Sequence, residues 1–106
     1  MSKTITVVGG GLGGLATAAL LARAGHKVTL VEGNEWLGGK SRRIEVAGQR
    51  IDTGPSLVTF PGVWQQILET WDSFGDGPSA ETIAGVKLER LPEVGRYYFR
   101  GQAANL

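Results

Sequence analysis

The chain has 106 residues, of which 42% are hydrophobic, and its formal net charge at pH 7 is +1. This length allows one domain or a part of one, and the near-neutral charge gives no electrostatic reason to expect nucleic acid as the partner. The sequence has no cysteine and one histidine, His26, so we predict no disulfide, thiol nucleophile or metal site, and we place His26 in a surface turn.

The first residues lack the long apolar segment of a signal peptide, and no apolar run approaches the roughly 18 residues that suggest a membrane span. Together with the lack of cysteine, this predicts a cytoplasmic protein. The 17 glycines are clustered rather than periodic, which indicates tight backbone turns around a ligand.

The first third of the chain predicts a right-handed parallel βαβ unit, the start of a Rossmann-type α/β fold with an incomplete parallel sheet. Residues 3–8, KTITVV, and residues 27–32, KVTLVE, are β-branched runs typical of buried strands. Between them, residues 12–24 are rich in Ala and Leu and are followed by Gly25, as in a helix. The residues expected to face the sheet are Leu12, Leu15, Ala19 and Ala22.

Three glycines in the turn after the first strand match the GxGxxG spacing of dinucleotide-binding folds. Gly9 would permit the tight turn, Gly11 would let the backbone approach a pyrophosphate, and Gly14 would let helix and strand pack closely. This logic does not require Gly10 or Gly13.

The residues on either side of this turn narrow the choice of ligand. The helix that begins near Leu12 directs its first amide groups and the positive end of its dipole at the phosphates, so no Lys or Arg is required there. Glu32 lies 18 residues after Gly14, where a carboxylate accepts hydrogen bonds from a ribose diol. Because a carboxylate would repel a 2′-phosphate, NADP is disfavoured, and NAD and FAD stay open.

A second glycine pair, Gly38 and Gly39, follows the acid by six residues and precedes Lys40. A second close backbone approach beside a cation suits a larger dinucleotide whose pyrophosphate contacts two loops. A Gly-Gly turn with a solvated basic flank explains these residues equally well.

The chain from the glycine cluster through LGGKSR to RIDTGPSLVTFP, residues 50–61, resembles the start of the phytoene desaturase family. These are FAD-dependent carotenoid desaturases within the wider amine-oxidase-like flavoproteins. DTGPSLVTFP is the most specific motif, and the likeness covers residues 3–74, with VKLERLPEVGRYYF matching more loosely. One departure is Trp36, where relatives usually carry a basic residue, although Lys40 keeps a cation after the glycine pair.

The resemblance implies an FAD-dependent oxidoreductase that removes hydrogen from adjacent carbons of an apolar polyene such as phytoene, with peripheral membrane contact. Because members of the family are several times longer, we expect an N-terminal fragment that is inactive alone. Residues 1–60 would form part of the FAD-binding domain, and residues 61–106 the start of a truncated substrate-binding domain. No catalytic side chain is predicted, since the flavin carries the chemistry. The predicted cofactor-binding residues are Gly9, Gly11, Leu12, Gly13, Gly14, Glu32, Gly38, Gly39, Lys40, Gly54, Pro55 and Ser56.

The second half of the chain predicts short elements. Residues 42–54 would form two strands around a turn at Ala47 and Gly48 and return the chain to the sheet. Gly54 and Pro55 would fix a rigid turn, which the resemblance places near the flavin ring. Asp52 would accept a hydrogen bond from a loop amide or touch the cofactor.

Residues 62–73 predict a helix, residues 76–82 a loop with a helical turn, and VKLERL and RYYFR two strands. The helix would bury one apolar face, made of Val63, Trp64, Ile67, Leu68 and Trp71.

Three other interpretations stay open. A flavin amine oxidase would share the first 45 residues but is disfavoured by DTGPSLVTFP. A non-catalytic NAD-binding or FAD-binding module would not need the second glycine pair. A protein encoded by a gene remnant and unable to fold would show little cooperative unfolding.

Overall fold

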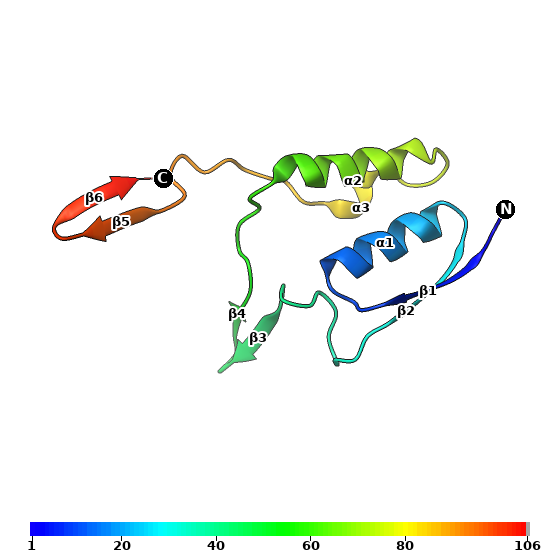
Figure 1. Ribbon diagram of the computed structural model, residues 1–106, viewed down its shortest axis with the longest axis horizontal. Coiled ribbons are helices and arrows are strands. Elements are labelled where there is room, and N and C mark those ends of the chain that lie inside the picture. Colours follow the sequence, from blue (N-terminus) through cyan, green and yellow to red (C-terminus); the bar gives the residue numbers. More distant parts are fainter. Residues whose placement is uncertain (106) are drawn as a thin grey trace.

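The computed structural model describes residues 1–105, apart from the side chains of residues 83 and 84. It has mixed helices and strands, which confirms the predicted α/β class (Figure 1). In chain order the elements are β1 (Thr4–Val8), α1 (Leu12–Arg23), β2 (Lys27–Val31), β3 (Arg43–Val46), β4 (Gln49–Asp52), α2 (Pro61–Ser73), α3 (Ala80–Ala84), β5 (Arg96–Phe99) and β6 (Gln102–Asn105).

The N-terminal βαβ unit forms as expected. β1 and β2 pair in parallel, in register from Thr4 opposite Lys27 to Val8 opposite Val31. α1 makes the crossover and covers one face of this two-stranded sheet (Figure 1). Side chains alternate along each strand, so one face is half-buried while the other is exposed. The half-buried residues are Ile5, Val7, Val28 and Leu30.

The predicted sheet-facing stripe of α1 is wrong in part. Leu15 is half-buried, but Leu12, Ala19 and Ala22 are exposed. The physical reason is that α1 contacts the strands on one side and α2 on another, so its contacts spread around the helix. The half-buried apolar residues of α1 are Leu15, Ala16, Ala18, Leu20 and Leu21.

α2 and α3 lie on the side of α1 away from the sheet (Figure 1). Arg23 at the end of α1 makes this connection, because its guanidinium donates to the carbonyl oxygens of Gly75, at 2.6 Å, and Asp76. The same guanidinium lies 5.3 Å from the ring centroid of Trp71 in α2. One side chain therefore joins the end of α1 to α2 and to the loop between α2 and α3.

α2 and α3 lie in the segments where the sequence predicts a helix and a helical turn. α2 begins at Pro61, whose fixed φ suits the first position of a helix. Four of the five residues predicted for its apolar face are half-buried, whereas Val63 is 57% exposed. The side chain of Ser79 caps α3 by accepting a hydrogen bond from the amide of Thr82 at 3.2 Å.

The β3–β4 hairpin turns at Ala47 and Gly48, as predicted, and the φ angles of 51° and 77° are those of a two-residue hairpin turn. The expectation that it rejoins the first sheet is wrong, since β3 and β4 form a separate two-stranded sheet. The two-residue turn between the four-residue strands brings them together as neighbours, and they pair with each other.

The second hairpin corrects one of the two strands predicted near the end of the chain. RYYF forms β5, but its partner is β6 and not VKLERL, which has no strand structure. Arg100 and Gly101 have φ angles of 49° and 77°, so a two-residue turn brings the next four residues back beside β5. β6 was not predicted, because QAAN lacks β-branched side chains.

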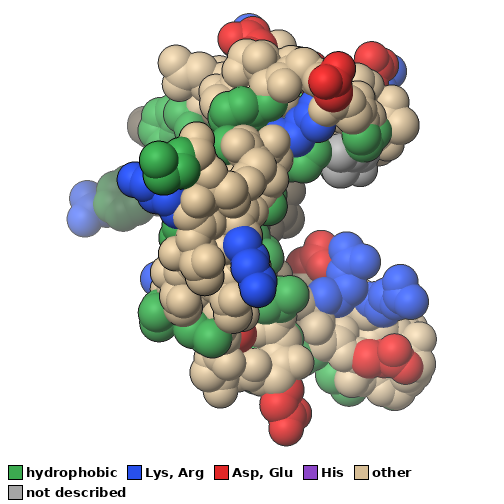
Figure 2. Space-filling view, turned by 90° about the vertical axis from the view of Figure 1, so that its right-hand side faces the viewer, with side chains coloured by type: hydrophobic (Ala, Val, Ile, Leu, Met, Phe, Trp, Pro, Cys, Tyr) green, Lys and Arg blue, Asp and Glu red, His purple; other side chains and the backbone are tan. Residues whose placement is uncertain are grey.

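The described residues form no closed hydrophobic core. The radius of gyration is 18.0 Å, whereas a compact domain of this length has about 13 Å. Ala80, at 4% exposure, is the one buried hydrophobic residue in the described part of the chain, while Val8 is 83% exposed. Figure 2 shows a molecule that is hollowed on one side, with hydrophobic side chains on its surface. The chain thus holds its elements by local pairing and a few specific contacts.

Neither hairpin packs on another helix or strand among residues 1–105. Within that range, no helix combines the length and apolarity needed to cross a bilayer.

We expect Arg23→Met to loosen the loop between α2 and α3 in the full-length protein, because the loop carbonyls lose their charged donor. Limited proteolysis should show about tenfold faster cleavage within residues 74–79. Arg100→Met is the control, since that guanidinium only stacks on Phe99, at 5.2 Å. Equal cleavage rates in the wild type and Arg23→Met would contradict the joining role.

Candidate functional site

The first glycine turn links β1 to α1. Gly9 has φ of 102°, and its amide donates to the carbonyl oxygen of Val31 at 2.8 Å, so the turn starts as a continuation of the parallel ladder. A Cβ on Gly14 would overlap the carbonyl oxygen of Gly9. These positions therefore have the turn and packing roles that the GxGxxG spacing predicts.

The mouth of this turn is open and rich in hydrogen-bond donors. A Cβ added to Gly11 or Gly13 would meet nothing within 4 Å. No side chain caps α1, and its first turn holds no acidic residue. The first amides of a helix lack intrahelical partners, so those of Leu12, Gly13 and Gly14 can donate to phosphate oxygens.

Gly10 is the buried centre of the site. Its amide donates to Glu32 Oε1 at 2.8 Å, and its carbonyl oxygen accepts from the amide of Gly38 at 2.7 Å. A Cβ here would lie 2.6 Å from Leu37 Cδ2 and 3.2 Å from Glu32 Oε1. The GxGxxG logic assigns Gly10 no role, but two distant segments converge on its backbone. The spacing of the motif gave no signal for this role.

Glu32 is held as an ionised acceptor at the end of β2. Its Oε2 accepts from the amide of Asn34 at 2.8 Å and from Asn34 Nδ2 at 3.2 Å. These backbone bonds, first from Asn34 and then from Gly10, lower the pKa of Glu32 below its usual 4.5. A carboxylate has about four acceptor sites, so one stays open, and rotation of the Asn34 side chain would free another. Glu32 can therefore receive a ribose diol.

The second glycine turn touches the first. Gly38 and Gly39 have φ of 105° and 60°, and Gly38 forms a parallel bridge with Gly11. A Cβ on Gly39 would lie 3.1 Å from Gly11 Cα. Lys40 follows with an exposed side chain. The two predicted loops thus meet at the open N-terminus of α1.

The segment after β4 returns to this second turn. A Cβ on Gly54 would overlap the carbonyl oxygen of Lys40, so only glycine permits the approach. Pro55 and Ser56 follow in an exposed, irregular stretch. The structure therefore gathers residues 9–14, Glu32, residues 38–40 and Gly54, and leaves Pro55 and Ser56 at the edge of the group.

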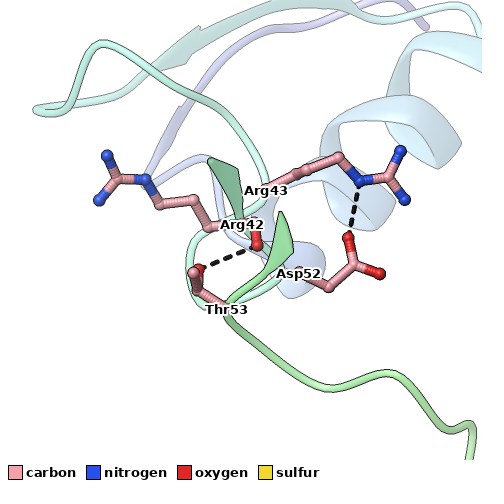
Figure 3. A network of polar contacts seen from close by, with 4 residues as sticks. All are labelled: Arg42, Arg43, Asp52 and Thr53. Carbon is pink, nitrogen blue, oxygen red and sulfur yellow. Dashed lines mark hydrogen bonds and ion pairs between the residues drawn. The ribbon is translucent and has the colours of Figure 1, made fainter. Parts of the chain in front are cut away.

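Asp52 pairs with an arginine rather than with a loop amide. Its Oδ1 lies 2.6 Å from Arg43 Nε, directly across the β3–β4 hairpin (Figure 3). The hydrogen bond from Arg43 lowers the pKa of Asp52 and raises that of Arg43. Sequence reasoning missed the pair because β3–β4 register decides it. Asp52 therefore supports the hairpin.

These residues suit a dinucleotide. No side chain caps the start of α1, a Cβ at Gly11 or Gly13 would meet nothing within 4 Å, and Glu32 holds its carboxylate at the end of β2 beside Gly10. Residues 1–105 contain no cluster of three His, Asp or Glu that could hold a metal ion.

A pair of glycine variants tests the geometry of the first turn. We expect Gly14→Ala to destabilise the protein by about 1–3 kcal/mol, because its methyl group overlaps backbone. Gly13→Ala is the matched control and should stabilise the ligand-free protein by up to about 1 kcal/mol, because alanine favours the helix. Thermal unfolding of the full-length variants measures both, and equal effects would contradict the assigned packing.

The lowered pKa of Glu32 predicts that the folded protein loses stability at acidic pH. Because this pKa is lowered in the folded protein, the contribution is complete above the unfolded value of 4.5 and is lost as the pH falls through the folded value. Unfolding between about pH 3 and 7 should show a weaker acid dependence in Glu32→Gln than in the wild type. Identical pH profiles would show that Gly10 and Asn34 do not hold the carboxylate.

Comparison with known proteins agrees with this geometry. Residues 7–74 match the model of the family described as NAD(P)-binding Rossmann-like domain. A phytoene desaturase of Fusarium fujikuroi is 39% identical over 89 residues, which are 84% of this chain and 15% of that protein. A carotenoid 3,4-desaturase of Haloarcula japonica is 53% identical over 66 residues, 62% of this chain and 13% of that protein.

A 4,4'-diaponeurosporene oxygenase of Staphylococcus aureus is 36% identical over 99 residues, 93% of this chain and 18% of that protein. The chain thus spans less than a fifth of the length of these relatives. The site is that of a dinucleotide-binding fold, and the resemblance predicted from the sequence motifs is confirmed. The chain belongs to the family described as NAD(P)-binding Rossmann-like domain, and it is similar to a part of two carotenoid desaturases.

Proposed function

We propose that the chain binds the ADP portion of FAD in an oxidoreductase that desaturates a carotenoid precursor such as phytoene. The contact between the two glycine turns, beside the ionised Glu32, carries this proposal. The names of the relatives, two carotenoid desaturases and a diaponeurosporene oxygenase, support a polyene substrate.

Different residues would bind different parts of the nucleotide. The amides of Leu12 and Gly13 would donate to the pyrophosphate, which can approach because Gly11 has no side chain. Glu32 would accept hydrogen bonds from the adenosine ribose. Lys40 would add a positive charge beside the second turn.

The second turn favours FAD over NAD. A minimal dinucleotide site needs the first turn and the acid, and Gly38 and Gly39 add another backbone approach at the mouth of α1. Gly54 packs on that turn, so the following Pro55 and Ser56 would extend the site toward the flavin. Two loops around one pyrophosphate suit the larger cofactor.

When bound, FAD supplies the acceptor for hydride, and this chain holds and orients its nucleotide end. Residues 1–60 would belong to the FAD-binding domain and residues 61–106 to the start of the substrate-binding domain. Because a long polyene dissolves in lipid rather than in water, we place the enzyme in the cytoplasm with peripheral contact to the membrane.

Titration of the full-length protein with FAD and NAD tests the cofactor. We expect tighter binding of FAD, and a loss of about tenfold or more in Glu32→Gln, because one charged acceptor is replaced by an amide that faces backbone donors. Glu35→Gln is the matched control, since Glu35 is an exposed carboxylate in the same loop.

Phytoene and a primary amine, offered in turn to the FAD-loaded protein, test the reaction. Formation of new conjugated double bonds, followed by absorbance, is the expected result. Tighter binding of NAD than FAD would overturn the cofactor assignment, and oxidation of the amine alone would overturn the substrate class.

A further inference from the structure

Trp36 forms a platform beside the second glycine turn. The indole is half-buried, and its Nε1 donates to the carbonyl oxygen of Gly39 at 3.3 Å. The guanidinium carbon of Arg42 lies 3.9 Å from the centroid of the indole. This distance is well within the roughly 6 Å of a cation–π contact, so the guanidinium is held against the ring.

The backbone of Arg42 is fixed as well. Its carbonyl oxygen accepts hydrogen bonds from both the amide and the hydroxyl of Thr53, at 2.9 and 3.0 Å (Figure 3). Because Thr53 directly follows β4, the hairpin anchors Arg42 at its base. Arg42 is therefore restrained at its backbone by Thr53 and at its guanidinium by Trp36.

Arg42 and Arg43 differ in how their charges are balanced. The two side chains point in opposite directions, and Arg43 is paired with Asp52 at 2.6 Å (Figure 3). Among residues 1–105, no carboxylate lies within ion-pair distance of Arg42. A guanidinium that stacks on a ring leaves its in-plane N–H groups available as donors. These groups can form bidentate hydrogen bonds to a phosphate.

The platform links this charge to the second glycine turn, which itself contacts the first. Trp36 is bonded to Gly39, and Gly39 packs against Gly11, where the first turn has room for a ligand. Arg42 follows Gly39 by three residues, and its contact with Trp36 brings its charge back to the second turn. Its charge adds to that of Lys40.

We propose that Arg42, held by Trp36, binds the pyrophosphate of the dinucleotide at the second glycine turn. This inference rests on the proposed function, because it concerns the same nucleotide. Trp36 is a positioning residue in this account, and Arg42 makes the contact with the ligand.

The test uses Arg42→Gln in the full-length protein, with ADP and adenosine as probes that differ by the two phosphates. We expect the dissociation constant for ADP to rise about tenfold, and that for adenosine to stay unchanged. The dependence of ADP affinity on salt should also become weaker, because one charge no longer meets the phosphates. Arg43→Gln is the matched control and should leave both affinities unchanged.

A second variant keeps the test independent of folding. Trp36→Phe keeps a ring for Arg42 but loses the bond to Gly39, so its loss of ADP affinity should be smaller than that of Arg42→Gln. Trp36→Ala should repeat the loss in Arg42→Gln without further loss when the two are combined. Equal changes for ADP and adenosine, or no change in Arg42→Gln, would overturn the inference. If the wild type binds neither FAD nor ADP, the proposed function falls with it; if the wild type binds FAD and Arg42→Gln binds it equally well, only the role of Arg42 falls.

Discussion

The convergence of two segments on Gly10 is the constraint on which the site depends. The amide of Gly10 holds Glu32, and its carbonyl oxygen holds Gly38, so both polar groups of one peptide unit are used between distant parts of the chain. A side chain at Gly10 would meet Leu37. Removal of either bond would leave a buried backbone group without a partner, which is costly.

This constraint explains how an open structure carries a well-defined site. The parallel pair β1 and β2 is covered by α1 on one face and exposed on the other, whereas a parallel sheet in a complete α/β domain is covered on both. The glycine turns nevertheless meet through backbone bonds that need no large core. The exposed face of the sheet is where further elements of a complete domain would pack.

The parts that the sequence predicted are those governed by local rules. Strand and helix periodicity, the turn at Ala47 and Gly48, and the start of α2 follow from residue type and spacing. The register of Gly9 and Gly14 also follows, because their roles belong to a single turn.

The parts that it did not predict depend on contacts between segments. The role of Gly10 arises only when Glu32 and Gly38 approach it. The stacking of Arg42 on Trp36 arises only when the turn at Gly38 and Gly39 folds the chain between them back. Strand β6 was missed for a different reason, since a two-residue turn overcame the weak strand preference of its residues.

A crystal structure of the full-length protein with its dinucleotide bound tests the central claim most directly. The account predicts that the pyrophosphate lies between the first amides of α1 and the turn at Gly38 and Gly39, with the adenosine ribose on Glu32. A nucleotide bound elsewhere, or a Glu32 carboxylate turned away from the ribose, would contradict it.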